Sequence, residues 1–150
     1  MGSAAGYRVW ATGRTEVKRR LASQLGAERT FGPGQKLPQL VDAVFDTSGA
    51  ATIGHSIESV KPGGAIVLCG VHSEGGSAEA KIDLLRLLTQ QITLTGVYAG
   101  TLQEFRDMIS FLAAKGVVPY VGKVLKLEDA GEGLRDIWEG RTDGKIVVQI

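Results

Sequence analysis

Three side chains that could bind an anion follow the first expected strand. Residues 7–12 are aromatic and β-branched and end at Gly13, which indicates a short strand and a turn. Arg14, Thr15 and Lys18 come next, and they offer a guanidinium, a hydroxyl and an ammonium to a phosphate group. The alternative is that these basic residues form only the solvated face of a helix.

Small residues stand where two later strands are expected to end. They are Thr47 and Ser48 after one strand, and Cys69, Gly70 and Val71 after the next. Small residues let a ligand approach the backbone closely, and ligands of parallel sheets bind beyond the carboxyl ends of the strands. The alternative for the two hydroxyl residues is that one of them caps the following helix.

Cysteine and histidine offer little chemistry of their own. Cys69 is the only cysteine of the chain, which excludes an internal disulfide and a zinc-binding cysteine cluster. No motif places a base beside it, so we predict a buried core thiol and not a nucleophile. His55 and His72 lack partners at metal-ligand spacing, and we expect no metal site.

Composition indicates an ordinary globular protein. The 150 residues have a formal net charge of +1, so electrostatics favours neither nucleic acid nor an anionic membrane as a partner. No apolar stretch approaches a membrane span, and the start does not resemble a signal peptide. We therefore expect a soluble protein of the reducing cytoplasm, with residues 1–6 as a tag or the remnant of a helix end.

Strands and helices alternate along the chain. A helix is expected from Thr15 to Gly26, because Val17, Leu21 and Leu25 repeat at four-residue spacing. Further strands are expected at Phe31 and over residues 42–46, 65–70, 92–97, 121–127 and 144–150. Further helices are expected over residues 51–60, 84–88, 102–115 and 128–138. This order predicts an α/β fold with a doubly wound, Rossmann-like parallel sheet.

Five segments together resemble the medium-chain dehydrogenase/reductase family, which includes zinc-type alcohol dehydrogenases and quinone oxidoreductases. They are residues 22–27, 44–49, 60–64, 94–96 and the Gly-Lys-Ile-Val-Val run at 144–148. No segment is specific alone, but their combination, order and spacing are, and the resemblance covers residues 7–150. The family's sheet begins with a strand and a Gly-x-Gly-x-x-Gly turn. The sequence contains no such unit, so the resemblance implies a Rossmann-like sheet truncated at its N-terminus.

The resemblance also implies how a cofactor would bind. The end of the first strand discriminates between nicotinamide cofactors, because an acidic residue there holds the adenosine ribose of NAD. Gly13 stands at this position, and with Arg14, Thr15 and Lys18 it favours NADP. Thr47 and Ser48 would flank the adenosine and bridging region.

Three further contacts follow from the resemblance. Cys69, Gly70, Val71 and Tyr98 would line the nicotinamide through main-chain groups. Lys145 would contact a phosphate, the alternative being a solvated lysine beside a turn.

The predicted function is part of an NADP-dependent oxidoreductase, which transfers hydride to or from a carbonyl, alcohol or activated alkene of a small-molecule substrate. The family's catalytic domain is not represented, so we expect no turnover by the chain alone. The resemblance divides the chain into residues 1–6, a truncated cofactor domain at 7–120, and a segment at 121–150 that in the family returns to the catalytic domain.

Two other functions remain open. An S-adenosylmethionine-dependent methyltransferase-like domain would also suit the apolar strand at 42–46 and the Lys-Pro-Gly-Gly that follows. A non-catalytic, self-associating module would follow if loss of the first strand left sheet edges open. By resemblance, the strand Ile92–Val97 would pair with its symmetry mate in a homodimer.

Overall fold

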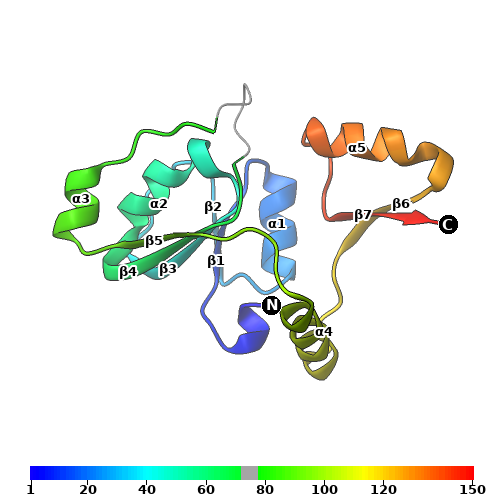
Figure 1. The fold of residues 1–150 in the computed structure, drawn as a ribbon, viewed down its shortest axis with the longest axis horizontal. Helices are drawn as coiled ribbons and strands as arrows, with labels where there is room; N and C mark the ends of the chain where they lie inside the picture. The colour runs from blue at the N-terminus through cyan, green and yellow to red at the C-terminus, as the bar shows by residue number, and fades with distance from the viewer. Residues whose placement is uncertain (72–77) are drawn as a thin grey trace. The chain divides into compact units, whose positions relative to one another are not determined.

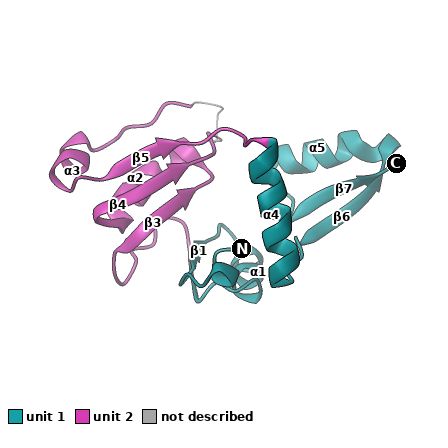
Figure 2. Cartoon of the chain, turned by 60° about the horizontal axis from the view of Figure 1, so that its bottom comes forward, with its two compact units in different colours: residues 1–30, 102–150 teal, residues 31–101 magenta. Residues whose placement is uncertain are grey.

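The computed structural model describes residues 1–71 and 78–150, which form an α/β fold. The chain divides into two compact units, residues 1–30 with 102–150, and residues 31–101 (Figure 2). His72 and the Gly- and Ser-rich loop predicted at residues 73–77 lie outside the described residues. Among the helices that the structure describes, none is long and apolar enough to cross a membrane.

The unit of residues 31–101 is built on a parallel sheet (Figure 1). Its strands are β3 (Val41–Asp46), β4 (Val60–Leu68) and β5 (Thr93–Gly96), in the order β3-β4-β5. The connecting helices are η2 (Gly49–Ala51), α2 (Ile53–Ser59) and α3 (Leu84–Thr89). The predicted alternation of strands and helices is present in this unit.

The core of this unit lies between the sheet and α2. Val44 pairs with Ile66 in the ladder, and their side chains pack against Ile53 and Ile57 of α2. Ile57 is 1% exposed and Ile66 is fully buried. Burial of each such side chain contributes about 1.5–3 kcal/mol to folding, so the apolar strands predicted from sequence hold the sheet in place.

The starts of one strand and one helix differ most from the prediction in this unit. Strand β4 begins at Val60, not Ala65, because Val60 already pairs with Val41. The register shifts before Ala43 pairs with Ala65, and residues 61–64 form the irregularity. The helix predicted at 51–60 begins at Ile53, because a 3-10 turn precedes it. Pro62, Gly63 and Gly64 were predicted to lie between a helix and a strand. In the structure they lie within β4, at its register shift.

The other unit begins with a short strand pair. Strand β1 (Trp10–Thr12) pairs with β2 (Arg29–Phe31), and α1 (Glu16–Gln24) lies between them in sequence. Thr15 caps α1, because its Oγ1 accepts a hydrogen bond from the Lys18 amide at 3.2 Å. A 3-10 turn, η1 (Ser3–Ala5), precedes β1.

The rest of this unit contains α4 (Leu102–Lys115) and a strand–helix–strand segment. That segment comprises β6 (Val121–Lys126), η3 (Leu127–Asp129), α5 (Ala130–Trp138) and β7 (Lys145–Gln149), with β6 and β7 parallel. The helix predicted at 128–138 starts at Ala130, because the preceding residues form the 3-10 turn. Gly133 lets α5 pack closely, since a Cβ there would lie 2.8 Å from Leu125 Cδ1.

The strand pairing follows parts of the Rossmann order. A doubly wound sheet has the classic order 3-2-1-4-5-6. The sheet β3-β4-β5 pairs in parallel and in sequential order, as strands 4-5-6 of that order do. Among the described strands, β1 and β3 each have a partner on one side only.

Candidate functional site

The turns after β3 and β4 meet in a close backbone contact. The Cys69 amide donates to the Asp46 carbonyl oxygen at 2.9 Å, which continues the ladder beyond β4. A Cβ built on Gly70 would lie 1.9 Å from the Thr47 carbonyl oxygen, and one built on Gly49 would lie 2.4 Å from the Gly70 carbonyl oxygen. The contact brings together the predicted site residues Thr47, Ser48, Cys69, Gly70 and Val71.

The carboxylate of Asp46 holds the turn after β3. Its Oδ1 accepts hydrogen bonds from the Ser48 and Gly49 amides, both at 3.0 Å, and from Thr52 Oγ1 at 2.7 Å. Its Oδ2 accepts one from Ser56 Oγ at 2.7 Å. Ser48 itself makes no side-chain cap hydrogen bond. Asp46 therefore has the capping role that the sequence suggested for a hydroxyl residue.

Burial and hydrogen bonding act on Asp46 in opposite directions. Asp46 is 4% exposed, and burial alone raises the pKa of its carboxyl. The hydrogen bonds from Gly49, Ser56, Thr52 and Ser48 together outweigh burial, so the pKa lies below its ordinary value. A carboxyl whose pKa is lower in the folded state stabilises the fold above its unfolded pKa. That stabilisation is lost as pH falls through the folded pKa.

We expect Asp46→Asn to remove an acid-sensitive part of the stability of residues 31–101. At neutral pH the variant should lose about 1–3 kcal/mol, because an amide replaces a charged acceptor of four hydrogen bonds. Below about pH 4 the difference should begin to shrink, because the Asp46 carboxyl is protonated first in the unfolded state and only at lower pH in the folded state. Urea unfolding at several pH values, monitored by hydrogen exchange of the β4 amides, measures both effects.

Asp42→Asn is the matched control on the same strand. Asp42 is exposed, and the pKa of its carboxyl is lowered by a hydrogen bond and ion pair with Lys61 at 2.6 Å. Exposed ion pairs contribute little to stability, so this substitution should leave the unfolding midpoint nearly unchanged. A loss as large as that of Asp46→Asn would contradict the role given to the buried carboxylate.

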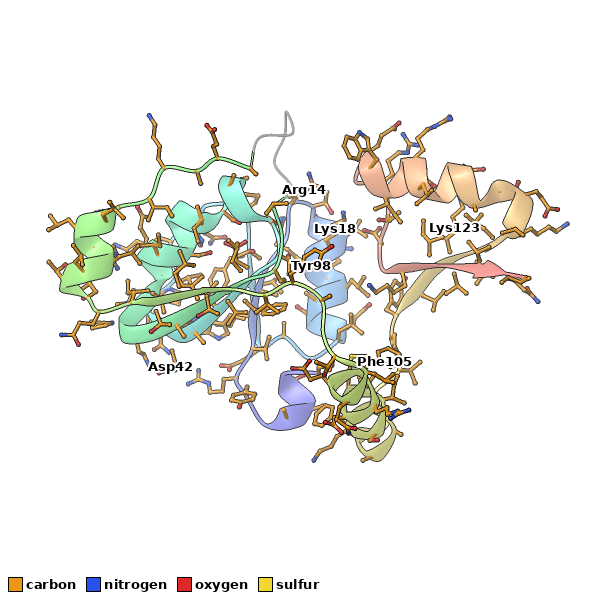
Figure 3. All side chains as sticks on the ribbon, viewed as in Figure 1. Arg14, Lys18, Asp42, Tyr98, Phe105 and Lys123 are labelled. Atoms are coloured by element: carbon orange, nitrogen blue, oxygen red, sulfur yellow. The ribbon has the colours of Figure 1, made fainter. Side chains whose placement is uncertain are left out.

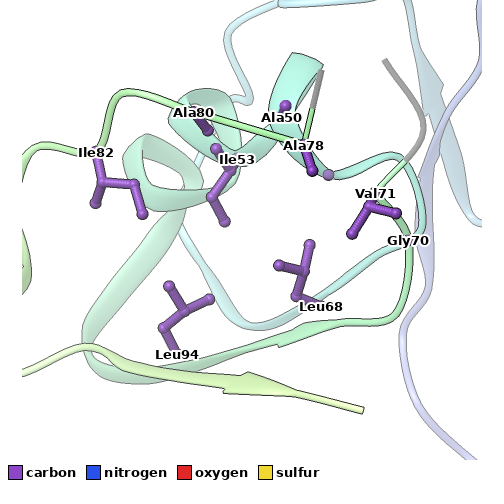
Figure 4. A pocket seen from close by; sticks show the side chains of 10 residues that line it. Ala50, Ile53, Leu68, Gly70, Val71, Ala78, Ala80, Ile82 and Leu94 are labelled. Carbon is purple, nitrogen blue, oxygen red and sulfur yellow. The ribbon is translucent and has the colours of Figure 1, made fainter. Parts of the chain in front are cut away.

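An apolar pocket of about 280 Å³ lies beside the glycine contact (Figure 4). Ile53 of α2, Leu68 of β4 and Leu94 of β5 line it, and Gly49 and Gly70 lie at the same pocket. Small-molecule sites combine apolar walls of this kind with a few polar groups, often main-chain groups. The pocket can therefore hold a ring-sized group, with backbone amides and carbonyls of the two turns close by.

Three predicted site residues have exposed side chains. Cys69 is exposed, so the prediction of a buried thiol is wrong. Cys69 follows Leu68, the last residue of β4, and its Sγ lies 3.6 Å from the Asp46 carbonyl oxygen. Val71 and Tyr98 are 66% and 99% exposed. Next to Tyr98, the Val97 amide donates to the Leu68 carbonyl oxygen at 2.8 Å, so the chain stays paired to β4 up to this position.

Arg14 and Lys18 extend toward one residue of the C-terminal segment, Gly140 (Figure 3 labels both basic side chains). Lys18 Nζ donates to the Gly140 carbonyl oxygen at 3.2 Å. A Cβ built on Gly140 would lie 2.6 Å from Arg14 Nη2. With the Thr15 hydroxyl at the N-terminus of α1, these groups form the basic cluster, by which we mean Arg14, Thr15 and Lys18.

The neighbouring arginines are occupied by other contacts. Arg20 forms an ion pair with Glu16 one turn away, and Arg19 Nη1 donates to the Gly13 carbonyl oxygen at 2.8 Å. Among the described residues, neither Arg14 nor Lys18 forms an ion pair with a carboxylate. The two cations of the basic cluster thus retain donors for an anionic ligand.

The remaining candidates lie elsewhere. Lys145 is an exposed residue at the start of β7, where its amide donates to the Tyr120 carbonyl oxygen at 2.9 Å. The His55 ring nitrogen Nε2 lies 2.9 Å from the Gln35 carbonyl oxygen. In the described part of the chain, no group of three or more His, Cys, Asp or Glu residues could hold a metal ion.

Asp46, Gly49 and Gly140 contribute to these sites but were not among the predicted site residues. The sequence did indicate the role of Asp46. In Asp-Thr-Ser-Gly the aspartate side chain can accept a hydrogen bond from the amide two residues later, which is typical of an Asx turn. No local signal identified Gly140, which lies 122 positions from Lys18 in the sequence. Only the folded chain brings these residues together.

The comparisons with known proteins assign the class of this fold. The profile of the zinc-binding dehydrogenase family matches residues 1–114. The chain therefore belongs to the zinc-binding dehydrogenase family, and it represents a nucleotide-binding domain of the medium-chain dehydrogenase/reductase type.

Particular relatives support this membership. A zinc-type alcohol dehydrogenase-like protein of Schizosaccharomyces pombe is 28% identical over 98% of this chain and 46% of its own length. The crystal structure of an NAD-dependent alcohol dehydrogenase superposes with a TM-score of 0.81 at 28% identity, over 95% of this chain and 44% of that one. A crotonyl-CoA carboxylase/reductase variant in complex with NADP shares the fold at 21% identity and a TM-score of 0.85, over 99% of this chain and 45% of that one. The chain thus spans less than half the length of these relatives.

Proposed function

We propose that the chain is the cofactor-binding part of an NADP-dependent oxidoreductase. The observation that carries the proposal is the basic cluster, in which Arg14 and Lys18 lack carboxylate partners among the described residues. Gly13 ends the preceding strand region, where an acidic residue would repel a 2′-phosphate. A guanidinium and an ammonium attract that phosphate and bind it with charge-assisted hydrogen bonds.

The turns after β3 and β4 supply a second contact region for the dinucleotide. Thr47 and Ser48 pack against Gly70, and Gly70 and Val71 line the apolar pocket. Main-chain groups of residues 69–71 would orient the nicotinamide, with Tyr98 at the same edge of the sheet. Lys145 is proposed as a further phosphate contact from β7.

The cofactor, when bound, supplies hydride to a carbonyl or activated alkene or accepts it from an alcohol. The chain's own residues bind and orient that cofactor, and we assign none of them to the chemical step. The sequence contains no Gly-x-Gly-x-x-Gly turn to hold the pyrophosphate. We therefore infer weak binding and no turnover by these 150 residues alone.

The domain division, the homodimer and the cytoplasmic location are proposed from three other observations. The division at residues 7–120 and 121–150 follows the family resemblance. The open outer edge of β5, which pairs with β4 only among the described strands, supports the homodimer through Ile92–Val97. A cytoplasmic setting is proposed from the single cysteine.

Isothermal titration with NADPH, NADH and, separately, S-adenosylmethionine tests the proposal. We expect saturable binding of NADPH that is tighter than that of NADH. Binding of S-adenosylmethionine alone would favour the methyltransferase-like alternative, although β4 and β5 as well as β6 and β7 pair in parallel, and a methyltransferase fold ends in an antiparallel hairpin. Binding of none of the three would favour a non-catalytic module.

A further inference from the structure

Gly140 ends helix α5 in a conformation suited to glycine. Its φ is 66°, and its amide donates to the Ile137 carbonyl oxygen at 3.1 Å. The Arg141 amide donates to the Asp136 carbonyl oxygen at 2.9 Å, so the left-handed residue reverses the chain after the helix. These bonds leave the Gly140 carbonyl oxygen available to a donor from another element.

That donor is the ammonium group of Lys18. The bond of 3.2 Å places a cation at the C-terminus of α5, where the helix dipole favours positive charge. An ammonium has three donors, so two remain for a second acceptor. The contact therefore restrains the lysine, which otherwise has many rotamers, without using up its binding capacity.

The position of the Arg14 side chain also depends on Gly140, but for a steric reason. Its Nη2 lies where a side chain at position 140 would begin, 2.6 Å from the ideal Cβ position. Any residue other than glycine would have to displace the guanidinium. Gly140 thus restrains Lys18 through its carbonyl oxygen and leaves room for Arg14 beside it.

We propose that Gly140 is a positioning residue for recognition of the 2′-phosphate. This inference rests on the proposed function, and it extends that function to the C-terminal segment. The carbonyl oxygen at the end of α5 holds Lys18, and the hydrogen of Gly140 admits Arg14, so that both cations face one phosphate group. Discrimination between NADP and NAD then depends on the β6–α5–β7 segment as well as on the first turn of α1.

The test compares Gly140→Ala with Gly116→Ala. Both glycines have positive φ, 66° and 63°, so alanine has a similar backbone cost at each. A Cβ on Gly116 would meet nothing within 4 Å. Titration should show NADPH affinity reduced roughly fivefold in Gly140→Ala, with NADH affinity unchanged. Gly116→Ala should bind both cofactors as the wild type does.

Lysine acylation, followed by mass spectrometry, tests the contact without a cofactor. Lys18 should react more slowly than the exposed Lys36 in the wild type, because the Gly140 carbonyl oxygen holds its ammonium group. If the wild type prefers NADPH but Gly140→Ala weakens both cofactors equally or neither, only the positioning role is overturned. If Lys18 reacts as fast as Lys36 in the wild type, the positioning role is also overturned. A wild type without preference for NADPH would overturn the proposed function and this inference with it.

Discussion

Replacing Gly70 with alanine is expected to unfold much of the unit of residues 31–101. The added Cβ would lie 1.9 Å from the carbonyl oxygen of Thr47 and 2.4 Å from its carbonyl carbon. Both atoms belong to backbone, which cannot rotate away as a flexible side chain can. Relief requires separating the turns after β3 and β4, and Asp46 holds the first of these by four hydrogen bonds. We expect a loss of about 3 kcal/mol or more.

The measurement has to report on this unit specifically. Trp10 and Trp138 both lie in the other unit, so tryptophan fluorescence would not follow the change. Hydrogen exchange of the amides of Ile57 and Ile66, in the buried core, follows it directly. In Gly70→Ala these amides should lose most of their protection.

Gly96→Ala is the matched control for this substitution. Gly96 is the last residue of β5, and a Cβ there would meet nothing within 4 Å. Alanine should be tolerated with a change of about 1 kcal/mol or less. Equal protection in both variants and the wild type would show that the close contact of the two turns can relax without cost.

The elements of the fold were predictable because their signals are local. The apolar character of residues 42–46 and the four-residue spacing in α1 are properties of neighbouring residues. Where the prediction was wrong, a pairing across the sheet decided the outcome. Val60 joins β4 because Val41 is available as its partner, although Pro62-Gly63-Gly64 follows after Lys61.

The sites were predictable only in part, because some of their contacts join residues that are far apart in the sequence. Small residues at strand ends indicated where Thr47 and Gly70 would lie, because parallel strands end at one edge. Burial depends on what covers each residue, so the exposure of Cys69 could not be read from its apolar neighbours. The contact of Lys18 with Gly140 joins segments 122 positions apart and has no local signature.

Reversing the charge at Arg14 is expected to abolish the proposed preference for NADPH. In Arg14→Glu a carboxylate would face the 2′-phosphate, and the charge-assisted hydrogen bonds of the guanidinium would be lost. Removal of such bonds together with like-charge repulsion should weaken NADPH binding by roughly 100-fold. NADH has no phosphate at this position and should bind about as well as before, or better where the new carboxylate accepts from the ribose. Titration of both cofactors at low ionic strength gives the ratio of their dissociation constants directly.

Arg20→Glu makes the same change in net charge on α1, the helix that follows Arg14. Arg20 already pairs with Glu16 and does not belong to the basic cluster. If the preference arises from general attraction of an anion, the two variants should weaken NADPH binding alike. If it arises from direct contact with the phosphate, only Arg14→Glu should change the ratio of the two affinities. An unchanged ratio in Arg14→Glu would remove the basis for assigning NADP, because the remaining contacts of the dinucleotide are common to both cofactors.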